Sequence, residues 1–273
     1  MCCATWPGRT ELRVSAPAPV ARSRLSEPPA RESPTNSRSM MRGVLALAIA
    51  AGAVAAAPVR AKPPVVLELY TAQGCASCGE ANAHVEALAD KSDVLPLTFG
   101  VDYWDYLGWK DTFAKPQFAE RQRAYDRRFD VAEVFTPQVI VDGRWQTPAV
   151  KTADVERLIA DAERERPDQP QMRWRGEDRL AVGSGPAPRG GADVWLVRYD
   201  PKESTVEVSD GDNRGNKIVE RNAVVQLERL GRWGGRPILL KVPPAPADGL
   251  RAVALLQGDD GGRILGVLTT DSP

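Results

Sequence analysis

Val65-Val66-Leu67-Glu68-Leu69-Tyr70-Thr71-Ala72-Gln73-Gly74-Cys75-Ala76-Ser77-Cys78 joins an apolar run to two closely spaced cysteines. The first half of this segment alternates its side chains between two faces and is rich in β-branched residues, which predicts a strand over 65–71. Residues 76–90 are rich in helix formers, and four apolar side chains recur there at helical spacing: Cys78, Ala81, Val85 and Leu88. The segment therefore predicts a strand followed by a helix, with Cys75 at the helix start and Cys78 on its buried side.

The alternation of strand and helix continues to about residue 165. Apolar runs at 94–101 and 138–141 predict two more strands, and the second run ends at the turn pair Asp142-Gly143. Residues 116–130 predict a helix with proline in its first turn, and Thr152 is placed to cap a further helix. This order of elements predicts an α/β sheet with crossover connections over residues 62–165.

A charged, proline-interrupted stretch at 163–171 separates this part from one with a different pattern. Short apolar runs then alternate with turns rich in Gly and Asp, and they show little helical periodicity. The predicted strands cover 194–199, 205–208, 219–227, 238–242, 250–256 and 264–268. We therefore expect a smaller β-rich domain over 172–273, built as an antiparallel sheet or sandwich.

The first 61 residues are expected to lie outside the folded domains. Residues 1–39 are rich in Pro, Ser and Arg without hydrophobic periodicity, so we expect disorder there, or a translation start at Met40 or Met41. Residues 40–61 have the basic start, short apolar run and small terminal residues of a signal peptide. Because that run is shorter than a usual membrane span, an uncleaved anchor is the alternative. Cleavage would leave Cys75 and Cys78 in a periplasmic or secreted protein, where disulfides persist.

Composition argues against several functional classes. Lys plus Arg and Asp plus Glu are both 36, so the chain lacks the basic excess that is typical of nucleic-acid binding. The one histidine, His84, argues against a Ser/His/Asp triad or a site of several histidines. A structural zinc commonly needs four ligands, more than one cysteine pair supplies. Residues 210–215 resemble a calcium loop, but Arg214 at a ligand position favours a hairpin turn. We expect no metal site.

The cysteine pair can carry two-electron chemistry. At a helix start, free backbone N–H groups and the helix dipole favour a thiolate, so Cys75 is the candidate nucleophile, accessible to substrate. Its attack on a disulfide forms a mixed disulfide, which Cys78 resolves from the next turn. The alternative is a permanently oxidised structural disulfide, although so short a loop would stabilise the fold little by restricting the unfolded chain.

An aromatic loop at 103–109 is a candidate substrate surface. The loop reads Tyr-Trp-Asp-Tyr-Leu-Gly-Trp in a chain with 6% aromatic residues. Trp104 is suited to wall a groove, and Asp105 is suited to orient a peptide or a small thiol. The alternative is that these aromatic side chains are part of the packed core.

Four strings of residues resemble a known family: 68–78, 101–111, 121–125 and Phe135-Thr136-Pro137-Gln138. They are similar to secreted bacterial proteins catalogued as domain of unknown function 1223, within the thioredoxin-like superfamily. The resemblance spans residues 65–268 and implies a thioredoxin-like domain over 62–165. Gly79 and Gly100 depart from the pattern, because relatives usually carry Pro and His at these positions.

The resemblance also implies roles for three residues. Pro137 stands in the place of the cis-proline that faces the disulfide in thioredoxin-like proteins, and Thr136 would present its backbone to an extended substrate. An ordinary trans proline at a strand start is the alternative. Glu68 lies near the place of a buried acid in thioredoxins, so it is a candidate for exchanging a proton with Cys78. A structural carboxylate paired with Lys or Arg is the alternative for Glu68.

These features together predict an exported thiol–disulfide oxidoreductase, with Cys75 as the nucleophile and Cys78 as the resolving cysteine. No organic cofactor is expected. The expected partner is a protein or small molecule that bears a thiol or disulfide, and a membrane contact is expected only through an uncleaved signal segment. The competing interpretation is a non-catalytic binding module that keeps the fold and uses the disulfide as a structural link.

Overall fold

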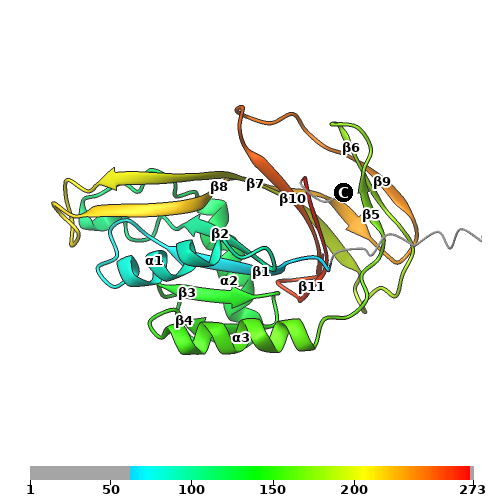
Figure 1. Ribbon diagram of the computed structural model, residues 1–273, viewed down its shortest axis with the longest axis horizontal. Helices are drawn as coiled ribbons and strands as arrows, with labels where there is room; N and C mark the ends of the chain where they lie inside the picture. Colours follow the sequence, from blue (N-terminus) through cyan, green and yellow to red (C-terminus); the bar gives the residue numbers. More distant parts are fainter. Residues whose placement is uncertain (1–61, 271–273) are drawn as a thin grey trace, which may run out of the picture. The chain divides into compact units, whose positions relative to one another are not determined.

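The strand β1 (Val65–Thr71) lies inside a large mixed sheet, and the cysteine-bearing helix follows it directly. The computed structural model describes residues 62–270 and is drawn in Figure 1. Helix α1 (Cys78–Leu88) connects β1 to β2 (Val94–Gly100), which pairs in parallel with β1 along its whole length. The predicted strand, helix and crossover are confirmed. The expected signal peptide and the residues before it lie outside the described residues.

Both faces of β1 are covered, which explains why all seven of its residues are buried. One face packs with α1 and with α3 (Thr152–Arg164) in a core that contains Leu67, Leu69 and Val85. The other face packs with α2 (Pro116–Phe129) in a core that contains Tyr70 and Phe118. A strand covered on both sides reads as a nearly continuous apolar run, as residues 65–71 do.

Two short strands complete the sheet beyond β1. The predicted strand β3 (Gln138–Val141) pairs antiparallel with β1, and β4 (Trp145–Pro148) pairs antiparallel with β3. The sequence pattern did not predict β4, which begins at Trp145, just after the Asp142-Gly143 turn. Thr152 is the first residue of α3 and makes no cap, since Lys151 holds the preceding position.

The C-terminal part of the chain continues the same sheet. The order of the eight strands is β11-β10-β7-β8-β2-β1-β3-β4, so β8 lies beside β2. Its strands are β7 (Ala192–Glu207), β8 (Lys217–Trp233), β10 (Arg251–Gly258) and β11 (Ile264–Thr269). The runs predicted at 194–199 and 205–208 belong to one long strand, β7. The parts expected as separate domains, 62–165 and 172–273, therefore share hydrogen bonds across one sheet. The stretch at 163–171 links α3 to the first strand of a second sheet.

A second, antiparallel sheet lies over the end of the large one. Its order is β5-β6-β9, and its strands are β5 (Met172–Trp174), β6 (Arg179–Val182) and β9 (Ile238–Lys241). Met172 and Leu180 from this sheet pack with Leu196, Leu256 and Trp233 from the large sheet. The β-rich character of the C-terminal part is thus present as two packed sheets. The sequence analysis did not predict β5 and β6, which have three and four residues.

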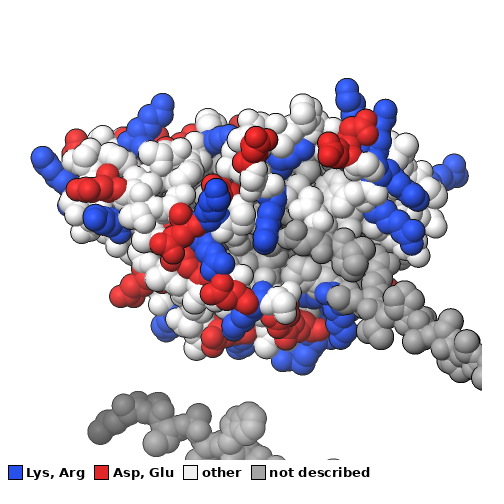
Figure 2. Space-filling model, turned by 45° about the horizontal axis from the view of Figure 1, so that its top comes forward, with Lys and Arg blue, Asp and Glu red and all other residues white. Residues whose placement is uncertain are grey.

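The surface of the described residues carries mixed charge. In the face drawn in Figure 2, acidic and basic side chains are interspersed over most of the area. This mixture agrees with the equal numbers of basic and acidic residues in the sequence. None of the helices within residues 62–270 combines the length and the apolar character that crossing a membrane requires.

The turn between β10 and β11 fixes the C-terminal strands against α2. Gly261 in this turn has a φ of +68°, and a Cβ added there would lie 2.9 Å from the carbonyl carbon and oxygen of Ala124. The nearest atoms belong to helix backbone, so a side chain at this position has no room to be accommodated by a rotamer change.

We predict that Gly261→Ala destabilises the protein by about 2–4 kcal/mol, because it adds a steric clash to an unfavourable φ. Gly249 is the matched control, since it has a φ of +78° and open space around its Cβ position. Gly249→Ala is expected to cost only about 1 kcal/mol. Urea unfolding followed by circular dichroism measures both, and equal losses would show that the turn does not pack closely on α2.

Candidate functional site

Cys75 and Cys78 form a disulfide at the N-terminus of α1. The turn that carries them is tight, because the Cys75 N–H donates to the Ala72 carbonyl at 3.0 Å and the Cys78 N–H donates to the Cys75 carbonyl at 3.1 Å. Ser77 precedes the helix without capping it, and its hydroxyl lies 3.5 Å from the Cys75 sulfur. The two cysteines therefore lie at the start of a helix, as predicted.

Both cysteines are buried, which corrects the expectation that Cys75 is accessible. Cys75 is 2% exposed and Cys78 is 1% exposed, although Ala76 and Ser77 between them are exposed. A residue far along the chain binds the backbone of this turn. The Asn213 Nδ2 donates to the Gln73 carbonyl at 2.7 Å and to the Cys75 carbonyl at 2.9 Å.

Asn213 is carried by a long hairpin of β7 and β8. We call residues 203–222 the hairpin arm and residues 208–216 its tip. The register of β7 against β8 shifts between Asp200 and Glu203, opposite Asn222, which has a φ of +53°. Such a bulge bends a hairpin, and Figure 1 shows the arm, in yellow, extending beyond β2 on the side of α1, which β8 contacts. The arm therefore brings Asn213 to the disulfide.

The aromatic loop and the proline predicted at the site are brought together. The Thr136–Pro137 peptide bond is cis, which confirms that prediction, and the trans alternative is wrong. Trp104 Nε1 donates to the Thr136 hydroxyl at 2.7 Å. Trp104 also packs against the core that contains both cysteines, next to Gly74. Trp104, Thr136 and Pro137 therefore lie in one region with the disulfide loop.

Tyr106 is an aromatic residue that the sequence did not single out. Its ring stacks on that of Trp104, with centroids 6.4 Å apart and an interplanar angle of 16°. Tyr106 is 78% exposed, whereas Trp104 is partly buried. The loop therefore serves both interpretations offered for it, because one ring packs on the core and its neighbour faces solvent.

Asp105 is used within its own loop. Its Oδ1 accepts the Asp111 N–H at 3.1 Å, and the Oδ2 of Asp111 accepts the Gln73 N–H at 2.7 Å. Asp111 also accepts N–H groups from Phe113 and Ala114, which favours its ionised form, but burial raises the pKa of Asp111. These bonds join the loop after the short helix at Asp105–Leu107 to the segment just before Cys75.

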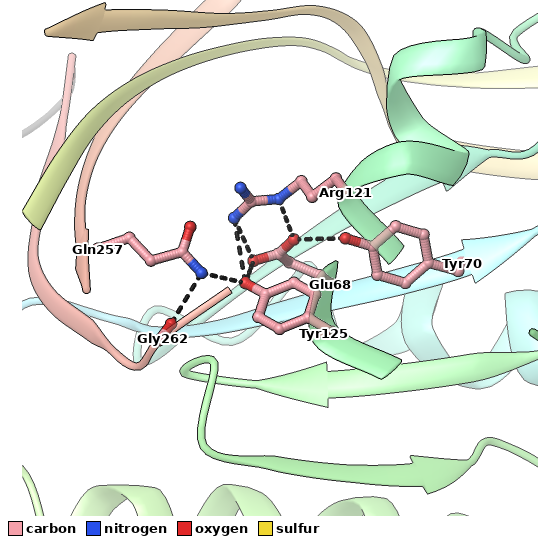
Figure 3. A network of polar contacts seen from close by, with 6 residues as sticks. All are labelled: Glu68, Tyr70, Arg121, Tyr125, Gln257 and Gly262. Atoms are coloured by element: carbon pink, nitrogen blue, oxygen red, sulfur yellow. Dashed lines mark hydrogen bonds and ion pairs between the residues drawn. The ribbon is translucent and has the colours of Figure 1, made fainter. Parts of the chain in front are cut away.

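Glu68 lies in a buried ion pair with Arg121, shown in Figure 3. Arg121 donates from Nε to Oε2 at 2.7 Å and from Nη2 to Oε1 at 2.9 Å. The hydroxyls of Tyr125 and Tyr70 donate to the same carboxylate at 2.7 and 2.9 Å. Four donors fill the acceptor positions of a carboxylate. These are the contacts expected of a structural carboxylate, the alternative considered for Glu68.

The network around Glu68 reaches the C-terminal strands. Gln257 Nε2, from β10, donates to the Tyr125 hydroxyl and to the Gly262 carbonyl, each at 2.8 Å (Figure 3). The guanidinium of Arg121 also lies over the rings of Phe99, Tyr125 and Trp195. Burial raises the pKa of Tyr125 well above its ordinary value. The hydroxyl is therefore a stable donor to Glu68 at neutral pH.

Glu220, on the hairpin arm, is a second buried carboxyl that the sequence analysis did not identify as a candidate. It is 1% exposed, and both of its oxygens are buried with no hydrogen-bond partner. Burial, followed by the nearby carboxylates of Asp111 and Glu86, raises its pKa to about 8, against an opposing effect of Gln73. The sequence alternation places Ile218, Glu220 and Asn222 on one face of β8. The structure shows that all three residues on this face are buried.

The turn at 210–215 lies within the hairpin tip, between β7 and β8. Its Asp210 accepts the N–H of Gly211, as in many tight turns. Within residues 62–270, no three His, Cys, Asp or Glu side chains are grouped so that they could hold a metal ion.

The fold and the site define a mixed α/β protein with a CxxC disulfide under a hairpin arm. A model of the family described as "Protein of unknown function (DUF1223)" matches residues 66–257, and the chain belongs to this family. A crystal structure of an Agrobacterium tumefaciens protein is similar, with 29% identity, a TM-score of 0.63, and coverage of 77% of this chain and 95% of that one. HBP35 of Porphyromonas gingivalis has 13% identity and a TM-score of 0.48, over 77% of this chain and 75% of that one. None of the curated proteins matches the sequence.

We predict that Glu68→Gln destabilises the protein by about 3–5 kcal/mol, because it leaves the guanidinium of Arg121 buried without its counter-ion. Glu165→Gln is the matched control, since Glu165 pairs with Arg144 at the surface. That change is expected to cost less than about 1 kcal/mol. Chemical unfolding curves at pH 7 measure both values, and a Glu68→Gln loss as small as the control would contradict a structural role for the ion pair.

Proposed function

We propose that this protein is an exported thiol–disulfide oxidoreductase whose large domain has the thioredoxin-like fold. The observation that carries the proposal is the Cys75–Cys78 disulfide at the N-terminus of α1, directly after a buried strand. The two sulfurs lie in one region with Trp104 and the Thr136–Pro137 bond. This combination places a disulfide next to groups that are able to bind an extended chain.

The proposed reaction exchanges one disulfide for another. A substrate thiolate attacks the Cys75 sulfur, the Cys75–Cys78 bond breaks, and Cys78 leaves as a thiolate that takes up a proton. The second thiol of the substrate loses its proton and attacks the substrate sulfur of the mixed disulfide, which releases Cys75. The substrate dithiol is thereby oxidised to a disulfide, and the protein disulfide is reduced to two thiols. The same steps in reverse reduce a substrate disulfide.

The helix start supplies the electrostatic part of this chemistry. The first turn of α1 has backbone N–H groups without partners inside the helix, and the helix dipole adds a partial positive charge there. Both effects stabilise a thiolate at the sulfur they face. Cys75 precedes the helix, so a negative charge on its sulfur is stabilised best.

Trp104, Tyr106 and Thr136 form the proposed substrate surface. The exposed ring of Tyr106 lies on Trp104, and the indole of Trp104 holds the Thr136 hydroxyl. An extended substrate can then pair with backbone groups at Thr136, in the manner of an added strand. The expected ligand is a peptide segment that carries a thiol or a disulfide.

The hairpin tip has to move before substrate reaches Cys75. The Asn213 amide donates to the carbonyls of Gln73 and Cys75, the same type of bond that a substrate N–H would make. A bound substrate segment can therefore replace the two bonds that the tip gives up. When the tip opens and substrate binds, substrate N–H groups replace the Asn213 amide as donors to these two carbonyls.

The proposed location follows from the expected signal peptide at 40–61. Export would bring the cysteine pair into an oxidising compartment, where disulfides form and persist. Thiol–disulfide exchange there needs a second redox couple that restores the starting state of the protein. We propose that another thiol–disulfide protein or a small thiol supplies it.

A second function, that of a non-catalytic binding module, is favoured by one observation. Both cysteines are buried, and Asn213 of the hairpin tip binds the Cys75 carbonyl. A disulfide that never becomes accessible would act only as a link in the turn before α1. Tyr106 and the loop around it would then be the functional surface.

We predict that the wild-type protein reduces insulin disulfides with dithiothreitol as electron donor, and that Cys75→Ser abolishes this turnover. Cys78→Ser is the informative partner variant, because it keeps the nucleophile but removes the resolving thiol. It is expected to accumulate a mixed disulfide between Cys75 and insulin, detected by mass spectrometry. A measured redox potential completes the assay. Absence of turnover in the wild type, with a disulfide that resists strong reductant, would support the binding module instead.

We predict that Asn213→Ala speeds reduction of the disulfide by a small reductant about tenfold, because two hydrogen bonds that hold the tip are lost. Arg214→Ala is the matched control, since Arg214 is an exposed neighbour in the same tip. The control is expected to react at the wild-type rate. Thiol appearance, followed by a chromogenic reagent, measures the rates. Equal rates in all three proteins would show that Asn213 does not limit access.

A further inference from the structure

Glu220 is buried in a way that protein carboxyls rarely are. Both carboxylate oxygens lack a hydrogen-bond donor, whereas Glu68, equally buried, has four. The Gln73 amide donates one N–H to the Thr112 hydroxyl at 2.8 Å, and its other N–H favours the Glu220 carboxylate without reaching hydrogen-bond geometry. A buried carboxyl without donors is costly to ionise and is far less costly as a neutral acid.

Glu220 lies between two sets of contacts that hold the hairpin arm, one at its tip and one at its base; we call these contacts the anchors. At the tip, Asn213 binds the carbonyls of Gln73 and Cys75. At the base, the Asn222 Nδ2 donates to the Pro96 carbonyl at 2.9 Å, and Arg221 pairs with Asp90 at 2.8 Å. Glu220 lies on the buried face of the strand that joins these anchors. A charge that appears at Glu220 therefore acts on the whole arm.

The charged groups that face Glu220 are mostly acidic. Asp111 lies on the loop that holds Gln73, and Glu86 lies on α1. Glu86 in turn faces Glu203 on β7 and Arg221 on β8, and its Oε1 is buried without a partner. Arg221 is the cation of this group, and it is paired with Asp90. An ionised Glu220 would meet two carboxylates, with the Gln73 amide as the nearby donor that partly offsets them.

We propose that Glu220 is a positioning residue that keeps the hairpin arm closed only as a neutral carboxylic acid, so that loss of its proton opens the arm and gives thiols access to the Cys75–Cys78 disulfide. This regulation rests on the proposed function, because it controls entry to the same sulfur pair. Each opening releases one proton from Glu220 to solvent, and each closure takes one up. No electrons move in this step.

The sign of the pH dependence follows from the two states. In the closed arm the pKa of Glu220 is about 8, and in an open, solvated arm it returns towards its ordinary value of 4.5. Between these values the open state holds fewer protons than the closed state, so raising the pH favours opening. The open population is expected to rise up to tenfold per pH unit in this window and to level off above pH 8.

The same pH window activates the reactants of the exchange. An ordinary thiol has a pKa of about 8.5, so the thiolate fraction of a substrate also rises between pH 5 and 8. Opening of the arm and formation of the attacking thiolate are therefore favoured together. At low pH the disulfide would be covered at the time when thiols are least able to attack it.

The test measures reduction of the disulfide by tris(2-carboxyethyl)phosphine between pH 5 and 8.5. In this reaction the phosphine is oxidised to its oxide with oxygen from water, and the disulfide is reduced to two thiols. Wild type, Glu220→Gln and Glu207→Gln are compared, since Glu207 is an exposed carboxyl on the same arm. Dividing the wild-type rate by the Glu220→Gln rate removes the pH dependence of the reagent.

The expected ratio of wild-type to Glu220→Gln rates rises at least tenfold between pH 5.5 and 7.5. Glu207→Gln is expected to follow the wild type throughout. A ratio that stays constant across this range would overturn the proposal, and so would a Glu207→Gln profile that matches Glu220→Gln.

Hydrogen exchange on the wild-type protein gives a second measurement that needs no variant. After correction for intrinsic exchange rates, amides of Val219 and Arg221 are expected to lose protection with rising pH, whereas those of Val194 and Leu196 keep theirs. Equal behaviour of the two sets would contradict opening of the arm.

The phosphine is not a substrate, so the insulin assay is an independent result. Turnover with a constant ratio would refute this inference alone, and a rising ratio without turnover would refute only the oxidoreductase.

Discussion

The buried ion pair between Glu68 and Arg121 is the interaction on which the arrangement of the chain depends. Glu68 lies on β1, Arg121 on α2, and the network ends at Gln257 on β10. One cluster of polar contacts therefore connects the central strand, the helix that covers it and the C-terminal strands. Taking a charge pair out of water is costly, and breaking one costs more, because the remaining charge has no partner. Any rearrangement that separates these elements has to pay that cost.

Because this network holds the C-terminal strands against α2, β7 and β8 have a fixed starting point. β8 joins the sheet beside β2, and the hairpin then continues past the sheet as the arm over α1. The C-terminal part of the chain thus contributes a residue, Asn213, that binds the backbone of the disulfide loop. The site is built by two segments more than 130 residues apart, Gln73–Cys75 and Asn213.

The α-helices and strands up to α3, except β4, could be predicted from the sequence, because each has a local periodicity or apolar run. Strands β1 and β3 have the predicted bounds, and the cis bond before Pro137 followed from the family resemblance. Burial of Cys75 could not be predicted, because it depends on pairing between β8 and β2 and on a bulge at Asn222. No pattern near Cys75 indicates that an amide 138 residues away binds its carbonyl. The strands β4, β5 and β6 were not predicted from the sequence pattern.

The two buried glutamates differ in what surrounds them, and this difference assigns them opposite roles. Glu68 has a guanidinium and two hydroxyls as donors, so its charge is compensated within the fold. Glu220 has both oxygens without a hydrogen-bond partner and faces other carboxylates, so burial raises its pKa and disfavours its ionised form. A fully satisfied carboxylate suits a permanent contact between layers. An unsatisfied one suits the contact that we propose to break, because it lies on the arm whose tip binds the backbone of the disulfide loop.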